Sequence, residues 1–377
     1  MKVLGIVAEY NPFHTGHAYL IEEARRLYHP DVVIAVMSGT FTQRGEPAIL
    51  SKWTRARIAV QNGADVVFEL PLVPAVESAD YFAQGGVRLL HAAGVTDLCF
   101  GAETDDTALF VTLTKAVMND QSTYDSYVRE YMKGGLRYAD ATNKALSQLT
   151  GHDVTKPNDL LAFSYVKVIV QNEYDITPHA ILRQGDFHSD SLGDFASASA
   201  LRKALTKGKD VSQYLPGYDT YKDEKLVTFD DFFEYLRYRC LILNENEPLH
   251  MNDEGLGKLL LKHIDDATSM DDLVERMTSR RYTRGRIRRF LTHVLLNTTE
   301  DEARAAMHPD YLRVLAFSKT GQAYLHDLRE TSSLPVLTRV TMHDHPALLL
   351  ERRAASLRHL IDGSSATDEY AKIPWHE

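Results

Sequence analysis

Residues 2–28 read KVLGIVAEYNPFHTGHAYLIEEARRLY, and this stretch decides the fold. Lys2–Val7 is a short run of apolar, partly β-branched residues, which is typical of a strand buried on both faces. Ala18–Tyr28 is a helical stretch, and the loop between the two, Glu9–His17, carries Gly, Pro, Asn and two His. A strand, a loop and a helix in this order begin a βαβ unit.

The alternation of strand and helix continues through the first hundred residues. We predict strands over Asp31–Met37, Asp65–Leu70 and Thr96–Phe100, and helices over Lys52–Asn62 and Glu77–Ala93. Strands separated by helices of this length pair in parallel. The sequence therefore predicts an α/β fold with a Rossmann-like, doubly wound parallel sheet.

The remainder of the chain predicts a second domain. A helix, a strand and a helix are expected at Asn158–Gln171, Asp175–Arg183 and Ser197–Leu205. Residues 105–150 break the alternation and are interpreted as a helical insertion. The polar stretch 211–224 contains Pro and Gly, which favours a boundary there. We expect a sheet-containing domain at 1–215 and a mainly helical domain at 216–377.

The composition is that of a folded protein from a reducing compartment. Of the 377 residues, 44% are hydrophobic and 25% are charged, which excludes wholesale disorder. The two cysteines, Cys99 and Cys240, exclude a disulfide framework and a cysteine-rich zinc site. No signal peptide or transmembrane stretch is visible, so we expect a cytoplasmic protein without a membrane partner. The net charge of −10 argues against general coating of nucleic acid, and no DNA partner is expected.

The loop after the first strand is the strongest candidate site. It lies at the carboxyl edge of the predicted sheet, where open α/β sheets bind ligands, and at a helix N-terminus, which favours phosphate. His14 and His17 flank Gly16 and can both donate hydrogen bonds to a phosphoryl oxygen. Two other interpretations remain: the histidines cap the helix, or they bind zinc. No further zinc ligands stand nearby, so no metal site is expected there.

The motif resembles a known signature. Asn11–His17 (NPFHTGH) is similar to the H-x-G-H motif of the class I nucleotidyltransferase superfamily. More segments resemble the tRNA(Met) cytidine acetate ligase family, namely Met37–Arg55, Asn62–Pro71, Ser78–Gln84, Phe100–Glu103, Lys156–Leu160, Ser197–Arg202 and Arg280–Leu296. The similarity spans roughly residues 1–300.

The resemblance implies an ATP-dependent ligase. Such an enzyme activates acetate as acetyl-adenylate, releases pyrophosphate, and transfers the acetyl group to N4 of the wobble cytidine of elongator tRNA(Met), with Mg²⁺ neutralising the pyrophosphate. The resemblance also implies that residues 1–215 form the catalytic domain and that residues 216–377 form the tRNA-binding domain. The implied ATP contacts are Val7, Ala8, Glu9, Tyr10, Asn11, Pro12, Phe13, His14, Thr15, Gly16, His17, Ala18, Tyr19, Leu20, Gly101, Asn158 and Arg183. Thr15 stands where the family often has Asn.

The residues themselves allow simpler interpretations of three of these positions. Gly101 just past the fourth strand would let adenosine approach closely, or it is an ordinary turn glycine. Asn158 stands where a helix N-cap would stand, after Pro157. Arg183 at a strand end could hold a phosphate with two hydrogen bonds, or lie on the surface.

Other polar residues near the predicted edge add candidates. Ser197, Ser199 and Arg202 begin a helix and could bind the β- and γ-phosphates of ATP, or merely cap that helix. Lys52 lies beyond the second strand and could steer acetate or pyrophosphate as a catalytic cation. His343 and His345 form an H-x-H pair that we interpret as a surface loop rather than a metal site.

A dense basic segment lies at residues 276–289. It has seven arginines and no acidic residue: Arg276, Arg280, Arg281, Arg284, Arg286, Arg288 and Arg289. Apolar residues recur at helical spacing after it, so one face can be buried while the arginines face outward. We expect Arg280, Arg281, Arg284 and Arg288 to bind RNA phosphates. The alternative is ion pairing with the acidic stretches 252–254 and 265–272.

Two rival functions share these features. A cofactor-type adenylyltransferase would use the same histidines to join AMP to a small phosphate ester, but would not need the arginine-rich helix. A non-catalytic RNA-binding protein would retain the motif without activity.

Overall fold

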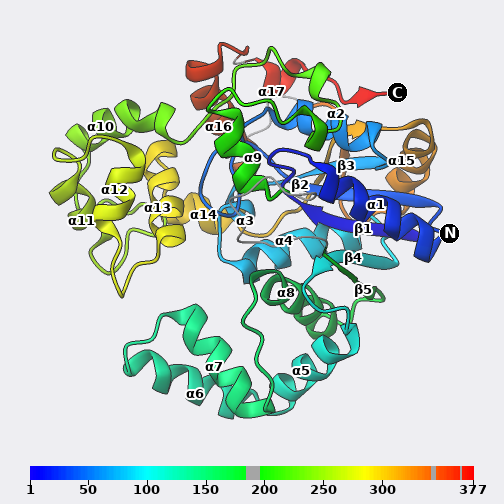
Figure 1. The fold of residues 1–377 in the computed structure, drawn as a ribbon, viewed down its shortest axis with the longest axis horizontal. Helices are drawn as coiled ribbons and strands as arrows, with labels where there is room; N and C mark the ends of the chain where they lie inside the picture. Colours follow the sequence, from blue (N-terminus) through cyan, green and yellow to red (C-terminus); the bar gives the residue numbers. More distant parts are fainter. Residues whose placement is uncertain (184–195, 341–344, 366) are drawn as a thin grey trace.

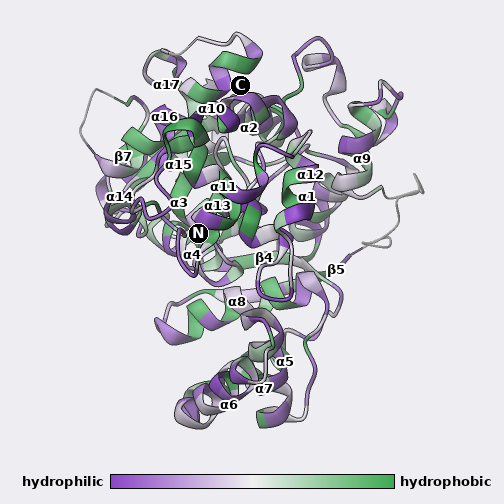
Figure 2. Ribbon diagram, turned by 90° about the vertical axis from the view of Figure 1, so that its left-hand side faces the viewer, coloured by the Kyte–Doolittle hydropathy of each residue, from purple (hydrophilic) through white to green (hydrophobic). Residues whose placement is uncertain are grey.

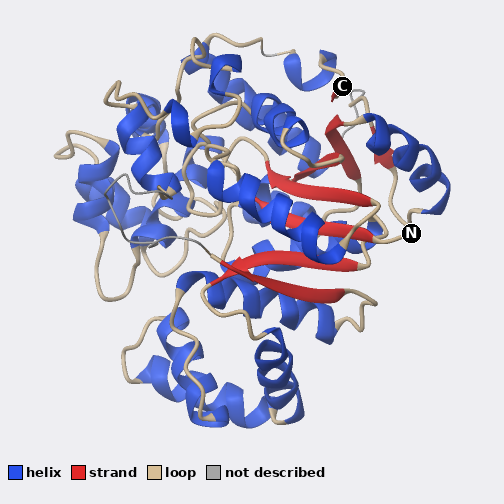
Figure 3. Cartoon of the chain, turned by 45° about the vertical axis from the view of Figure 1, so that its right-hand side comes forward, coloured by secondary structure: helices blue, strands red, loops and turns tan. Residues whose placement is uncertain are grey.

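A central sheet with helices on both sides organises the molecule (Figure 1, Figure 3). The computed structural model describes residues 1–183, 196–340, 345–365 and 367–377. Its strands are β1 (Val3–Ala8), β2 (Val32–Ser38), β3 (Val66–Leu70), β4 (Asp97–Ala102), β5 (Thr177–Leu182), β6 (Leu312–Phe317), β7 (Val336–Leu337) and β8 (Trp375–His376). The order across the sheet is β5-β4-β1-β2-β3-β6-β7, and β8 pairs with β6. Strands β1 to β5 pair in parallel, whereas β6 runs antiparallel to β3. The predicted α/β class is confirmed, with a mixed and mostly parallel sheet.

The sheet is buried on both faces because its strands are apolar throughout. All seven residues of β2 are buried. Val32, Ile34 and Val36 belong to one core, whereas Val33 and Met37 point to the other, as the two-residue period of a strand requires. The first core is covered by α4 (Ala79–Ala92), α8 (Pro157–Gln171) and α15 (Lys319–Thr331), and the second by α1 (Thr15–Tyr28), α2 (Lys52–Gln61) and α9 (Ala198–Leu205).

The strand order creates a switch point beside β1. From β1 the chain moves through β2 to β3 on one side, and then returns to place β4 and β5 on the other side. Loops that leave the carboxyl ends of β1 and β4 therefore turn in opposite directions and leave a crevice between them. Any ligand site of the type expected from sequence belongs in this crevice.

The remaining helices form three groups. An insertion between β4 and α8 lies below the sheet and consists of α5 (Thr107–Asn119), α6 (Gln121–Lys133) and α7 (Tyr138–Thr150) (Figure 2). A helical module with its own apolar core consists of α10 (Phe233–Ile242), α11 (Leu256–His263), α12 (Met270–Met277) and α13 (Arg284–Leu296). Shorter or later elements are α3 (Leu72–Ala75), α14 (Glu300–Ala306), α16 (Pro346–Asp362), α17 (Asp368–Ala371), and the 3₁₀ turns η1 (Ser212–Tyr214), η2 (Tyr218–Thr220) and η3 (Asp230–Phe232).

The C-terminal part of the chain returns to the sheet, which the sequence analysis did not anticipate. It contributes β6 next to β3, so residues 216–377 are not only helical. The division at residues 215 and 216 stays a prediction. The strand was missed because LRVLAF is a single short apolar run in a mostly helical part of the chain, and its partner β7 is only two residues long.

Candidate active site

A cavity of about 280 Å³ occupies the crevice between β1 and β4. We call it the β1–β4 cavity. Nine of the residues expected to contact ATP line it: Val7, Ala8, Glu9, Tyr10, His17, Leu20, Gly101, Asn158 and Arg183. The structure thus brings residues from four distant segments to the switch point of the sheet, as expected for a ligand site in this architecture.

The two histidines begin α1 and bind its backbone. His14 is the N-cap, and its Nδ1 accepts a hydrogen bond from the Gly16 N–H at 3.1 Å. The His14 N–H in turn donates to Nδ1 of His17 at 3.3 Å. Because both Nδ1 atoms are acceptors, both rings carry their proton on Nε2. The capping interpretation is therefore confirmed, and it leaves each Nε2–H as a donor without a partner among the described residues.

Both imidazoles are neutral. Burial, assisted by the positive charges of Arg183 and Arg202, lowers the pKa of His14 to about 3. Burial and the neighbouring ring lower the pKa of His17 well below its ordinary value. The centroids of the two imidazole rings are 3.9 Å apart. His17 lines the cavity, and His14 packs against the ring of His17. One neutral N–H donor, that of His17, is thus held at the wall of the cavity, and His14 supports it from behind.

The loop between β1 and α1 is held by a fully buried arginine that the sequence analysis missed. Arg55, on α2, donates to the carbonyl oxygens of Glu9 at 2.6 Å and Ser38 at 3.1 Å. Arg202 donates to the carbonyl of Asn11 at 2.7 Å from the other side. The fully buried guanidinium group of Arg55 and the half-buried one of Arg202 therefore fix the approach to the histidines. The position of Arg55 in an ordinary helical stretch carried no signal of this role.

Two expected contacts, Gly101 and Asn158, lie in different local structures from those predicted. Gly101 lies inside β4, and a Cβ there would meet Arg183 Cγ at 3.2 Å, so the glycine makes room for that side chain. The N-cap of α8 is Lys156, so the expectation that Asn158 caps this helix was wrong. The Asn158 side chain instead donates to Glu103 Oε1 at 2.5 Å, which orients it beside the cavity.

The other residues of the 7–20 segment do not line the β1–β4 cavity. They shape the turn or belong to α1: Asn11, Pro12, Phe13, His14, Thr15, Gly16, Ala18 and Tyr19. Phe13 is buried in the core beneath the sheet's second face.

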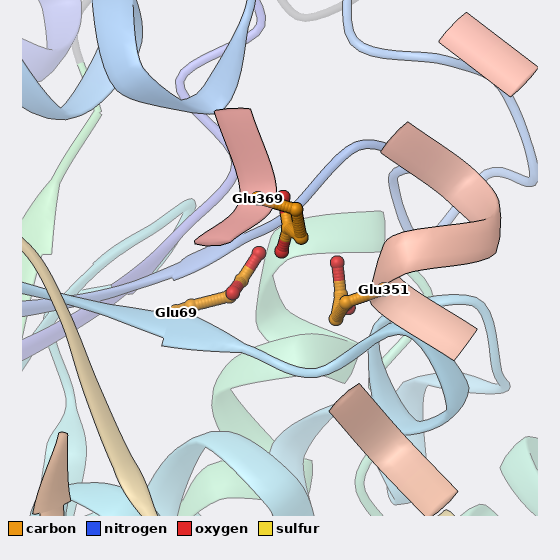
Figure 4. A group of neighbouring side chains, drawn as sticks. All are labelled: Glu69, Glu351 and Glu369. Atoms are coloured by element: carbon orange, nitrogen blue, oxygen red, sulfur yellow. The ribbon is translucent and has the colours of Figure 1, made fainter. Parts of the chain in front are cut away.

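Lys52 lies outside the cavity, in a buried cluster of charges whose three carboxylates, Glu69, Glu351 and Glu369, appear in Figure 4. Its ammonium contacts Glu69 at 2.5 Å, Glu369 at 2.7 Å and Glu351 at 3.5 Å. Arg313 also contacts Glu69, at 2.9 Å. The structure therefore does not bring Lys52 to the histidines, because three carboxylates hold its charge elsewhere. Within the described ranges these glutamates are also the one group spaced to bind a metal, but Lys52 and Arg313 already supply the positive charge.

The helix-start residues are divided between capping and a second cavity. Ser197 caps α9 by accepting from the Ala200 N–H. Ser199 and Arg202 line a separate cavity that adjoins the histidine loop. His345 caps α16 and contacts Asp310 at 2.8 Å, whereas His343 lies outside the described residues.

The arginine-rich segment is largely paired within the protein. Helix α13 begins at Arg284, so Arg280 and Arg281 precede it. The pairs are Arg281–Glu254, Arg284–Glu275, Arg286–Asp253, Arg288–Asp271 and Arg288–Glu46. Arg288 thus turns toward the loop after β2 rather than outward, and the expected single outward face was wrong. Arg280 has no ion pair among the described residues.

Comparison with known proteins shows which family the chain belongs to. A family model described as HIGH Nucleotidyl Transferase matches residues 1–372. A protein of Geobacillus sp. (strain WCH70) named tRNA(Met) cytidine acetate ligase is 37% identical over 380 residues, covering 95% of this chain and 94% of the relative. This chain belongs to the tRNA(Met) cytidine acetate ligase family. A relative of the same name from Halalkalibacterium halodurans is 38% identical and covers 94% of this chain and 91% of its own length.

Two solved structures support the family assignment. Apo TmcAL of Thermotoga maritima superposes with a TM-score of 0.92 at 29% identity, covering 100% of this chain and 99% of that protein. The T. maritima protein bound with alpha-thio ATP superposes with a TM-score of 0.90 at 30% identity, with the same coverage. The family resemblance predicted from sequence is therefore confirmed.

Proposed function

We propose that this chain is an ATP-dependent ligase that acetylates N4 of the wobble cytidine of elongator tRNA(Met). The observation that carries the proposal is the neutral Nε2–H donor of His17 at the switch-point cavity, with the neutral ring of His14 packed against it, in a chain of this family whose structural neighbour binds an ATP analogue. A neutral donor binds a phosphoryl oxygen without needing a titratable charge, and the start of α1 adds a partial positive charge.

The reaction has two steps. An acetate oxygen attacks the α-phosphorus of ATP, the bond to the β-phosphate oxygen breaks, and pyrophosphate leaves. The cytidine amino nitrogen then attacks the acetyl carbon, the bond to the AMP oxygen breaks, and the amino nitrogen loses one proton. His17, supported by His14, is proposed to donate to the α-phosphoryl oxygen as charge grows in the first step.

Magnesium is part of the proposal. When bound, it would neutralise the charge of the leaving pyrophosphate. Magnesium is usually held by one or two carboxylates together with substrate phosphates, and Glu9 is the carboxylate among the described lining residues. Its Oε1 accepts from the Gln43 N–H at 2.8 Å, which leaves the second oxygen available.

Acetate as the second substrate, a cytoplasmic location and the absence of a DNA partner stay predictions. In the described ranges no helix combines the length and the apolar character needed to cross a membrane.

The test is acetate-dependent exchange of pyrophosphate into ATP, followed by mass spectrometry of tRNA nucleosides after incubation with labelled acetate. His17→Ala should slow exchange by roughly 10²–10³-fold, the usual effect of losing one such donor. His152→Ala, on an exposed residue outside the cavity, is the matched control. An adenylyltransferase would instead retain AMP in its product, and wild-type protein that forms no N4-acetylcytidine would refute the proposal.

A further inference from the structure

A second cavity, of about 300 Å³, lies between the catalytic sheet and the helical module. We call it the module cavity. Arg44 and Glu46 line it from the loop after β2, Arg202 from α9, and Phe229 and Arg288 from the helical module. Arg44 also lines the β1–β4 cavity, so the two cavities meet at this residue.

We infer that the module cavity receives the acceptor base, a cytosine turned out of a single-stranded RNA loop. This inference rests on the proposed function and specifies where its second substrate binds. Transfer requires the amino nitrogen and the acetyl carbon in contact, so the acceptor pocket must adjoin the nucleotide pocket. Arg44 lines both cavities, and Arg202 lines the module cavity while it donates to the carbonyl of Asn11, in the histidine loop, at 2.7 Å.

The lining has the groups that a turned-out base requires. Phe229 is half-buried and offers a ring for stacking, which is how proteins hold unstacked bases. Arg44 and Arg202 bring positive charge to the lining, where flanking phosphates would lie, and Arg288 holds Glu46 in place beside them. The cavity thus combines an aromatic face with positive charge, as single-stranded RNA sites do.

Glu46 gives the cavity a preference for cytosine. Its carboxylate is fixed by Arg288 at 2.5 Å and lies 3.9 Å from Arg202. A carboxylate has about four acceptor positions, so these contacts leave room for an amino group. Cytosine presents an N4 amino donor, which pairs with Glu or Asp, whereas uracil presents a carbonyl oxygen at the same place. Glu46 is therefore assigned as a specificity residue for the base.

Two pairs of variants test the assignment. Phe229→Ala should lower kcat/KM for tRNA by roughly tenfold or more, as loss of one stacking contact does, and should leave acetate-dependent exchange at the wild-type rate. Tyr238→Ala, an exposed aromatic of the same module, is the control and should change neither rate.

Glu46→Gln should lower tRNA transfer, whereas Asp271→Asn, which removes the other ion pair of Arg288, should not. Equal losses for Glu46→Gln and Asp271→Asn would assign the effect to Arg288 and remove Glu46 from base recognition.

A crosslink locates the base directly. Elongator tRNA(Met) carrying 5-iodocytidine at the wobble position is irradiated with wild-type protein and ATP, and the attached peptide is sequenced. Attachment to the segment containing Phe229 supports the inference. If the base attaches elsewhere in a protein that does form N4-acetylcytidine, the assignment of the module cavity as the base pocket is overturned, whereas the proposed function stands. Failure to form N4-acetylcytidine overturns both.

Discussion

Lys52→Met is predicted to destabilise the fold through the buried charge cluster rather than through catalysis. The Lys52 side chain is 3% exposed, and those of Glu69 and Glu369 are 0% and 1% exposed. Removing one partner of a buried ion pair costs about 3–5 kcal/mol, because a buried charge loses its compensation. Arg313 still contacts both glutamates, so we expect the lower end, about 3 kcal/mol.

Glu351→Gln is the matched comparison. Three carboxylates face two cations, and burial with the adjacent charge of Glu69 raises the pKa of Glu351 well above its ordinary value of 4.5. Glu351 is then protonated and the cluster is neutral, so an uncharged amide of the same shape should cost about 1 kcal/mol or less. Above pH 4.5 the unfolded chain loses this proton while the native chain keeps it, so wild-type stability falls relative to Glu351→Gln as pH rises.

Urea unfolding followed by tryptophan fluorescence measures both variants. The chain has two tryptophans, and Trp53 lies with its ring 5.8 Å from the Lys52 ammonium, so the signal reports on the cluster. If Glu351→Gln is as costly as Lys52→Met, or if the stability of wild type relative to Glu351→Gln does not fall as pH rises, Glu351 is ionised and the reasoning fails. If Lys52→Met loses exchange activity without losing stability, Lys52 acts in catalysis and its structural role is refuted.

Other outcomes are expected elsewhere in the chain. Because burial lowers the pKa of His14 to about 3, exchange should show no histidine inflection near the ordinary value of 6.5; an inflection there that His14→Gln abolishes would contradict neutral rings. Gly45→Ala should destabilise the protein by more than about 1 kcal/mol in urea, because φ is +71° and a Cβ would lie 2.3 Å from the Arg289 backbone nitrogen. Arg280→Ala should lower tRNA affinity and reduce the salt slope by about 1; an unchanged slope removes it from the RNA interface.

Local patterns predicted the catalytic half of the fold well. The five parallel strands and the helices between them follow from apolar runs and helical stretches whose information lies within each segment. The histidine loop could also be located, because its place after a strand and before a helix is a local property. Neither result needed knowledge of a distant partner.

Long-range pairing could not be predicted in the same way. The Lys52 ammonium meets a carboxylate 317 positions away in Glu369, and the sequence offered only a lysine beyond a strand. Arg288 was expected to face RNA, but its carboxylate partner Glu46 lies on the loop after β2. A charged residue in a sequence does not reveal which opposite charge the fold will bring to it.

By itself, then, the sequence determined the α/β class, the position of the histidine loop and the family, because strand period, helix period and motif spacing act over a few residues. Only the tertiary structure decided the antiparallel return of β6, the burial of Lys52 and the inward turn of Arg288. Those features depend on packing and on the cost of an uncompensated buried charge, which arise only when segments hundreds of residues apart come into contact.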